Sequence, residues 1–190
     1  MDTKAILKAA EAQSVWMRDS LRTLVRHESP SEDRTSVIAA ATFVEQLAAP
    51  LGGRGKWHRQ KKYGDILEIH FGQTRSSRKP IILLGHLDTV WPLGTLRKMP
   101  WREEKGRYWG PGVLDMKAGV VMALAAVKAL QMNHLSRPVN LLLNSDEEVG
   151  SPVSRQVTER LARKAAAVFV LEPAQGLAYK TARKGVGFYN

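Results

Sequence analysis

The chain contains no cysteine among its 190 residues. This absence excludes disulfide-bonded scaffolds, thiolate zinc sites and cysteine nucleophiles, so any metal must be held by nitrogen and oxygen ligands. Long apolar runs are missing too: the longest, at residues 120–130, is about half a membrane span and contains Lys128. The N-terminal segment lacks the apolar core of a secretory signal. The sequence therefore predicts a cytoplasmic protein with no membrane partner.

Acidic residues are fewer than basic ones: 18 Asp and Glu stand against 29 Lys and Arg, for a formal net charge of +11. The excess is sharpest at residues 54–62, where basic side chains flank Trp57. Such a patch can track a nucleic-acid backbone, and a basic surface can also attract a small anionic substrate. A solvated hairpin or loop is the simplest interpretation. No specific nucleic-acid partner is predicted.

Apolar spacing in the first part of the chain predicts two helices, over residues 2–27 and 36–47, with Pro30 in the break between them. Residues 65–71 instead alternate between two faces, which predicts a half-buried strand with His70 on its solvent face.

Further along, the apolar runs become continuous. Three such runs, predicted as central strands covered on both faces, lie at residues 81–84, 139–143 and 168–171. Helices are predicted between them, over residues 116–131 and 152–163. This alternation indicates an α/β fold with a largely parallel sheet. Residues 184–190 resemble a strand that has just begun, so we expect the chain to stop inside an element.

Each predicted central strand ends in side chains that can bind a metal ion. In chain order, these residues are His86 and Asp88, then Asp146, Glu147 and Glu148, then Glu172. Asp115 lies in a glycine-containing turn immediately before the helix predicted at 116–131. Ligands of open α/β sheets bind beyond the carboxyl ends of the strands, so we expect these groups to converge.

Every one of these residues also has a purely structural interpretation. Asp115 suits a helix N-cap, and acidic residues 146–148 suit the first turn of a helix. His86 taken alone is more often a hydrogen-bonded histidine than a ligand, and Glu172 before a proline fits an ordinary loop. Their conjunction at one sheet edge favours a metal site, and histidine with carboxylates suits Zn²⁺ best, with Co²⁺ or Mn²⁺ less specific.

Four motifs resemble one known family. They are GHLDTV (residues 85–90), GPGVLDMKAG (110–119), NSDEEVGS (144–151) and LEP (171–173). In order and spacing they resemble the co-catalytic zinc metallopeptidases, which include glutamate carboxypeptidase of the carboxypeptidase G type, aminoacylase, acetylornithine deacetylase and succinyl-diaminopimelate desuccinylase. The resemblance implies a three-layer α/β/α zinc-hydrolase-like domain with a mixed, largely parallel sheet.

The same resemblance implies a role for each residue. His86 would bind one metal ion, Asp115 would bridge two, Glu172 would complete the first site, and Glu148 would bind the second ion. Asp88 would orient the imidazole of His86 through its other nitrogen, a task that histidine ligands generally require. Glu147 would be the general base that takes a proton from the attacking water and passes one to the leaving amine.

This sequence departs from the family at the second metal site, which in the family is completed by a histidine near the C-terminus. Here only His134 follows Asp115, and it precedes a predicted strand, at the wrong end of the sheet. The resemblance implies that residues 1–184 are the N-terminal part of a catalytic domain and that 185–190 begin a lid or dimerisation domain. The chain is therefore expected to be a fragment or a truncated product, and a weak or inactive enzyme by itself.

The function implied is metal-dependent hydrolysis of an amide bond. It would release a C-terminal amino acid, glutamate among the candidates, or deacylate an N-acyl amino acid. A homodimer is expected only when the lid domain is present. Two alternatives stay open: a catalytically incompetent remnant that still binds metal, and a basic nucleic-acid-binding module built on residues 54–62.

Overall fold

The computed structural model describes residues 3–72, 77–131, 137–174, 176, 178 and 180–182. The strand expected at 184–190, the second domain expected from 185, and His134 all lie outside these residues. Within them, no helix is long and apolar enough to cross a membrane.

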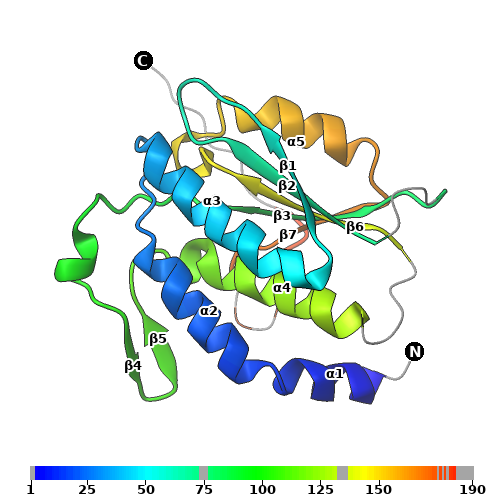
Figure 1. The fold of residues 1–190 in the computed structure, drawn as a ribbon, viewed down its shortest axis with the longest axis horizontal. Coiled ribbons are helices and arrows are strands. Elements are labelled where there is room, and N and C mark those ends of the chain that lie inside the picture. Colours follow the sequence, from blue (N-terminus) through cyan, green and yellow to red (C-terminus); the bar gives the residue numbers. More distant parts are fainter. Residues whose placement is uncertain are drawn as a thin grey trace.

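Five α-helices and seven strands make up the described fold. The helices are α1 (Thr3–Glu11), α2 (Ser14–Arg26), α3 (Arg34–Ala48), α4 (Ala118–Gln131) and α5 (Ser154–Ala162). The strands are β1 (Arg54–His58), β2 (Ile66–Phe71), β3 (Ile81–His86), β4 (Arg102–Glu104), β5 (Arg107–Trp109), β6 (Val139–Asn144) and β7 (Ala167–Val170). Strands β4 and β5 form a separate hairpin that projects from the body of the molecule (Figure 1).

The five other strands form one mixed sheet in the order β1-β2-β6-β3-β7. β6 pairs in parallel with β3, and β3 in parallel with β7, whereas β2 is antiparallel to both of its neighbours. Only β2 therefore runs against the others in this sheet. In the β3–β6 register, His86 stands opposite Asn144, so the residues that follow both strands emerge at the same edge.

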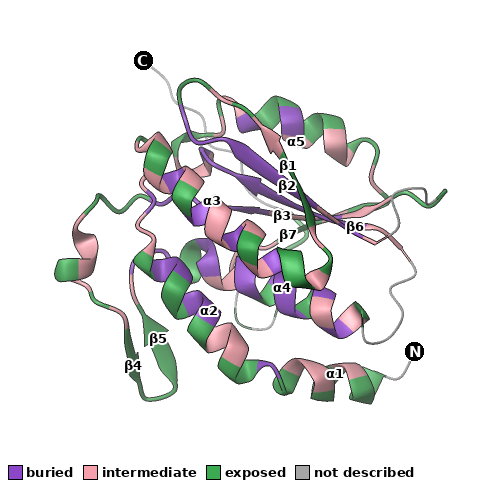
Figure 2. Ribbon diagram, viewed as in Figure 1, coloured by how far each residue is buried: buried purple, intermediate pink, exposed green. Residues whose placement is uncertain are grey.

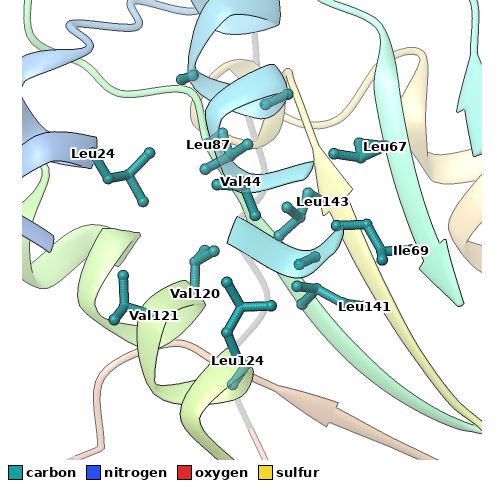
Figure 3. Close-up of a cluster of buried hydrophobic side chains, with 14 of the residues drawn as sticks. Leu24, Val44, Leu67, Ile69, Leu87, Val120, Val121, Leu124, Leu141 and Leu143 are labelled. Carbon is teal, nitrogen blue, oxygen red and sulfur yellow. The ribbon is translucent and has the colours of Figure 1, made fainter. Parts of the chain in front are cut away.

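Helices cover both faces of this sheet, because alternate residues of its strands point to opposite sides. Leu141 and Leu143 belong to a core shared with α2, α3 and α4 (Figure 3). Leu142 lies in a smaller core on the other face, with Val157 of α5. Figure 2 shows the buried residues concentrated between the layers. The predicted α/β/α fold with a mixed, largely parallel sheet is confirmed.

The N-terminal helix predicted over residues 2–27 is in fact two helices, and the break lies at Ala12 and Gln13. Gln13 is buried, and its side-chain amide donates to the carbonyl oxygens of Ala9 and, at 3.2 Å, Ala125 of α4. The interruption lets a polar side chain dock on α4, which apolar spacing cannot reveal.

Strand β2 was predicted to be half-buried but is buried along nearly its whole length. On the face expected to meet solvent, Glu68 is 1% exposed. Its carboxylate lies 2.9 Å from His58 Nε2 and 3.3 Å from His70 Nε2, and it accepts a hydrogen bond from Asn140. The alternation is therefore between apolar and polar neighbours, not between core and solvent, and His70 itself is half-buried.

Strand β7 was predicted to be central and covered on both faces, but it is the outermost strand of the described sheet beside β3. Phe169 and Val170 are 55% and 57% exposed. An apolar run indicates that a strand tends to be buried, but it does not indicate which segment packs against it. The prediction is wrong for the residues described.

Candidate metal centre

His86 is the last residue of β3 and is 1% exposed. Its backbone N–H lies 3.3 Å from the sulfur of Met116, which packs beneath it. Nδ1 lies 3.0 Å from the carbonyl oxygen of Asp88 and 3.3 Å from its Oδ1. Because these oxygens can accept the Nδ1 proton, the geometry leaves Nε2 as the atom that can bind a ligand.

Asp88 is fully buried and holds two parts of the site together. Its Oδ1 accepts a hydrogen bond from the backbone N–H of Glu147 at 3.2 Å, and its Oδ2 from that of Glu148 at 3.1 Å. The hydroxyl of Ser31 also donates to Oδ2, at 2.7 Å. Burial raises the pKa of Asp88, but the hydrogen bonds from His86 and Ser31 outweigh it and hold the pKa below its usual value.

Carboxylates from three further segments surround Nε2 of His86. Asp115 Oδ1 lies 3.1 Å away, Glu172 Oε1 3.2 Å and Glu147 Oε2 3.9 Å. The potential ligand atoms form two groups, and within each group all atoms lie within 4.8 Å of one another. One group is His86 with Asp115 and Glu148, and the other is His86 with Glu147 and Glu172. The six residues proposed from the sequence thus come together at one sheet edge. His86 lies at their centre.

Asp146, the remaining member of the acidic triplet, faces the protein. Its Oδ2 accepts hydrogen bonds from the backbone N–H groups of Val153 and Ser154, at 2.7 and 3.2 Å, where α5 begins. Asp146 therefore caps the start of α5, whereas Glu147 and Glu148 lie in the first turn of a short 3₁₀ helix beside the cluster, as the helix-start interpretation expects. Asp115 precedes α4 by three residues and has an extended backbone, with φ −117° and ψ 98°.

The other described histidines lie elsewhere. His27 stacks on the ring of Phe43 at 5.2 Å, and His58 and His70 flank Glu68. In the part of the chain that the structure describes, His86 is the only histidine in either group of potential metal ligands.

Sequence reasoning missed the residues that brace this edge from the segment after α2. Ser29 Oγ donates to the carbonyl of Leu87 at 2.6 Å, and Ser31 reaches Asp88. The buried ammonium of Lys117 donates to the carbonyl of His27 at 2.7 Å. Burial lowers the pKa of Lys117 to about 7, although Glu28 opposes the shift. The periodicity of the sequence does not predict these contacts, because polar residues between two helices look like an ordinary loop.

Comparison with known proteins identifies the fold and the motifs together. The model of the Peptidase family M20/M25/M40 matches residues 82–182, a span that includes all six cluster residues. The chain belongs to this family. The resemblance stated from the motifs is thereby confirmed.

Two curated relatives give the scale of the similarity. Carboxypeptidase G2 of Pseudomonas sp. (strain RS-16) is 30% identical over 172 residues, which cover 88% of this chain and 41% of that protein. Succinyl-diaminopimelate desuccinylase of Halorhodospira halophila is 35% identical over 159 residues, covering 76% of this chain and 41% of the enzyme. The M20/M25/M40 chain described here therefore spans less than half of the length of these relatives.

A solved structure agrees on the fold. The dipeptidase Dug1p from Saccharomyces cerevisiae superposes with a TM-score of 0.71 at 16% identity, over 88% of this chain and 40% of that one.

The electrostatics of this M20/M25/M40 site suit a divalent cation. Burial lowers the pKa of His86, but hydrogen bonds to Asp88 and Glu172 more than offset it and raise the pKa to about 11. Burial and the neighbouring Asp115 raise the pKa of Glu148 to about 7, and burial also raises that of Glu147. One imidazolium cannot neutralise five carboxylates, so the cluster favours additional positive charge. Its nitrogen and oxygen donors match zinc, and less specifically cobalt or manganese.

Proposed function

We propose that this chain carries the metal-binding part of a hydrolase that cleaves amide bonds in peptides or N-acyl amino acids. The bond cleaved would release a C-terminal amino acid, glutamate included, or an N-acyl group. The observation that carries the proposal is the convergence of Asp115, Glu147 and Glu172 on one imidazole nitrogen. The names of the relatives, a carboxypeptidase and a desuccinylase, agree with amide hydrolysis.

The roles implied by the family resemblance divide these ligands between two ions. His86, Asp115 and Glu172 would hold the first, and Asp115 with Glu148 would hold the second. Bound divalent ions polarise a scissile carbonyl and lower the pKa of the attacking water. Among the described residues, the second ion has two carboxylate ligands, one fewer than the three protein ligands usual for catalytic zinc.

The remaining steps belong to the chain itself. Glu147 lies in the turn over His86 and would accept a proton from the attacking water, then donate it to the leaving amine. Its raised pKa suits this exchange, because a base works best when its pKa approaches the working pH. Asp88 would keep His86 in one orientation and, through the two backbone N–H groups, keep Glu147 and Glu148 facing it.

Metal content tests the assignment directly. The parent chain, His86→Ala and Glu172→Ala would be dialysed against zinc and then against buffer, and their zinc measured by atomic spectroscopy. Both variants should lose the metal. Glu104→Ala removes an exposed carboxylate of β4 outside the cluster and should retain it. Equal zinc in all four proteins would overturn the proposal.

Substitution of Glu147 distinguishes a catalytic role from metal binding, which is the role proposed for Glu148. In protein that hydrolyses an N-acyl amino acid with zinc supplied, Glu147→Gln should lower turnover by a factor of about 10²–10⁴. Its metal content should change little. Release of the free amino acid is the measurement.

The nucleic-acid interpretation of residues 54–62 has less support. Arg59 is 2.6 Å from the buried carboxylate of Asp65, and Trp57 donates its indole N–H to Glu45. These side chains secure β1 and the loop after it. The basic stretch therefore has a structural role as the edge of the sheet.

A further inference from the structure

The segment that joins α2 to α3 contacts two sides of the candidate metal centre. This connecting segment comprises residues 27–31. One of its carbonyl oxygens accepts a hydrogen bond at 2.7 Å from the ammonium of Lys117, which lies in the turn that carries Asp115. In the other direction, the hydroxyl of Ser29 donates at 2.6 Å to the loop after β3. The connecting segment therefore links the turn before α4 to the loop after β3.

A cavity of about 780 Å³ lies between that loop and that turn. Its wall includes Trp91 and Met99 from the loop after β3, Leu114 and Asp115 from the turn before α4, and Glu148. The volume falls in the range of about 300–1,000 Å³ that is usual for small-molecule sites. The distance between the loop and the turn therefore sets the width of a route to the metal ligands.

Few apolar contacts hold the loop after β3 to the rest of the molecule. Val90, Trp91 and Leu93 are all exposed, whereas Leu96 packs against the main core. A segment with few buried apolar contacts opens at a low free-energy cost. The position of this loop therefore depends on its polar contacts.

Glu28 of the connecting segment supplies two of these polar contacts. Its Oε2 accepts a hydrogen bond from the backbone N–H of Gly94 and its Oε1 from that of Leu96, both at 2.7 Å. These donors lie at the start of the 3₁₀ turn Thr95–Arg97, where the first N–H groups of a helix need acceptors from outside it. Hydrogen bonds to a carboxylate are about twice as strong as neutral ones. One half-buried carboxylate thus fixes the loop with both of its oxygens.

From this geometry we infer that Glu28 is a positioning residue: it holds the loop after β3 at a fixed distance from the turn that carries Asp115. The inference rests on the proposed hydrolase function, because a substrate amide must lie between the loop and the turn to reach the metal ions. Misplacing a substrate by about 1 Å can cost about 10²-fold in rate. A loosened loop should therefore weaken substrate binding without removing the metal.

A purely electrostatic role is the alternative, since the negative charge of Glu28 stabilises the buried ammonium of Lys117. Two substitutions separate these roles. Glu28→Asp keeps the charge on a side chain one methylene shorter, and Glu28→Gln keeps the length but has one acceptor oxygen. Positioning requires both oxygens at the correct reach, so both variants should be defective, whereas a counter-charge requires only that a carboxylate be present.

Amide hydrogen exchange followed by NMR measures the hold on the loop and needs no substrate. In Glu28→Gln and Glu28→Asp, the amides of Gly94 and Leu96 should exchange about tenfold or more faster than in the parent, while the amides of β6 stay within about twofold. Glu32→Gln is the matched control, because it neutralises an exposed carboxylate four residues further along the chain. It should leave the exchange of the loop unchanged.

Calorimetric titration of the zinc-loaded proteins gives the functional readout. The probes are N-acetylglutamate, N-acetylalanine and N-acetyllysine, amides that differ in charge, and the variants are compared on the probe that the parent binds most tightly. Glu28→Gln and Glu28→Asp should each lower affinity for this probe about tenfold. Both should retain the zinc content of the parent, whereas a residue that only stabilised the fold would lower zinc content and affinity together.

Unchanged exchange at Gly94 and Leu96 in Glu28→Gln would overturn the inference. So would a Glu28→Asp variant that matches the parent in both assays, because only the counter-charge would then matter. Equally accelerated exchange in β6, or a zinc-loaded parent that binds none of the probes, would contradict it too. The hydrolase proposal fails separately, through a parent chain that binds no zinc, and the exchange rates then still decide whether Glu28 holds the loop.

Discussion

Replacing Asp88 by asparagine tests the argument that one buried carboxylate organises the site. Each oxygen of Asp88 accepts a backbone N–H, from Glu147 at Oδ1 and from Glu148 at Oδ2, and Ser31 also donates to Oδ2. An asparagine keeps only one acceptor oxygen. Whichever way its amide turns, an NH₂ group faces one backbone donor, and His86 loses the charged partner beside its Nδ1.

The magnitude follows from these losses. A buried donor left unsatisfied costs about 1–3 kcal/mol, and breaking a buried ion pair by removing one partner costs about 3–5 kcal/mol. Because these losses overlap in one network, we expect Asp88→Asn to lower the free energy of unfolding by about 3–5 kcal/mol, a large part of the about 5–15 kcal/mol typical of a domain. Zinc affinity should fall about 10–100-fold, as for other residues that orient a ligand.

Urea denaturation and zinc titration measure the two effects. Ser31→Ala removes one donor to the same carboxylate and should cost about 1 kcal/mol. Asp33→Asn is the matched control: its carboxylate accepts the backbone N–H of Ser36 at the start of α3, and asparagine caps a helix as well as aspartate does. If Asp88→Asn stayed within about 1 kcal/mol of the parent and bound zinc equally well, the network argument would be refuted.

Three further predictions follow from the site and the charge pattern. Glu148→Gln should lower zinc stoichiometry, measured by atomic spectroscopy, more than Glu147→Gln does; the reverse order would exchange their proposed roles. The pKa of His86 rises from 6.5 to about 11 and that of Glu148 from 4.5 to about 7 on folding. In the metal-free chain, the stability contributed by protonated Glu148 should therefore be lost as pH rises from about 4.5 to about 7, and that contributed by the His86 imidazolium as pH rises from about 6.5 to about 11. Zinc displaces both protons, so its effect on Tm should be larger at about pH 8 than at about pH 5.5. An equal shift of Tm at the two pH values would contradict the assigned protonation. Nucleic-acid binding should be weak, independent of sequence and steeply salt-dependent in a filter-binding assay, and tight binding at physiological salt that Lys61→Gln with Lys62→Gln abolishes would restore the nucleic-acid interpretation.

Much of this molecule is determined locally along the chain. Continuous apolar runs located β3 and β6, and apolar spacing located the N-terminal helices, because regular burial leaves a regular pattern in the sequence. The absence of cysteine fixed the donor chemistry. The position of His86 at the end of one strand and of Glu147 and Glu148 just after another was enough to predict their convergence, since parallel strands end at the same sheet edge.

Tertiary structure alone decided which polar groups meet. Ser31 and Asp88 are 57 positions apart and join in one hydrogen bond, and Glu68 is buried because His58, His70 and Asn140 surround it. The cavity beside Asp115 and Glu148 likewise takes its wall from the loop after β3, from β5 and from the turn before α4, which no periodicity connects. Periodicity reports how often a residue type faces the core, whereas pairing between polar or aromatic side chains depends on where separate segments pack, and only the folded chain brings those segments together.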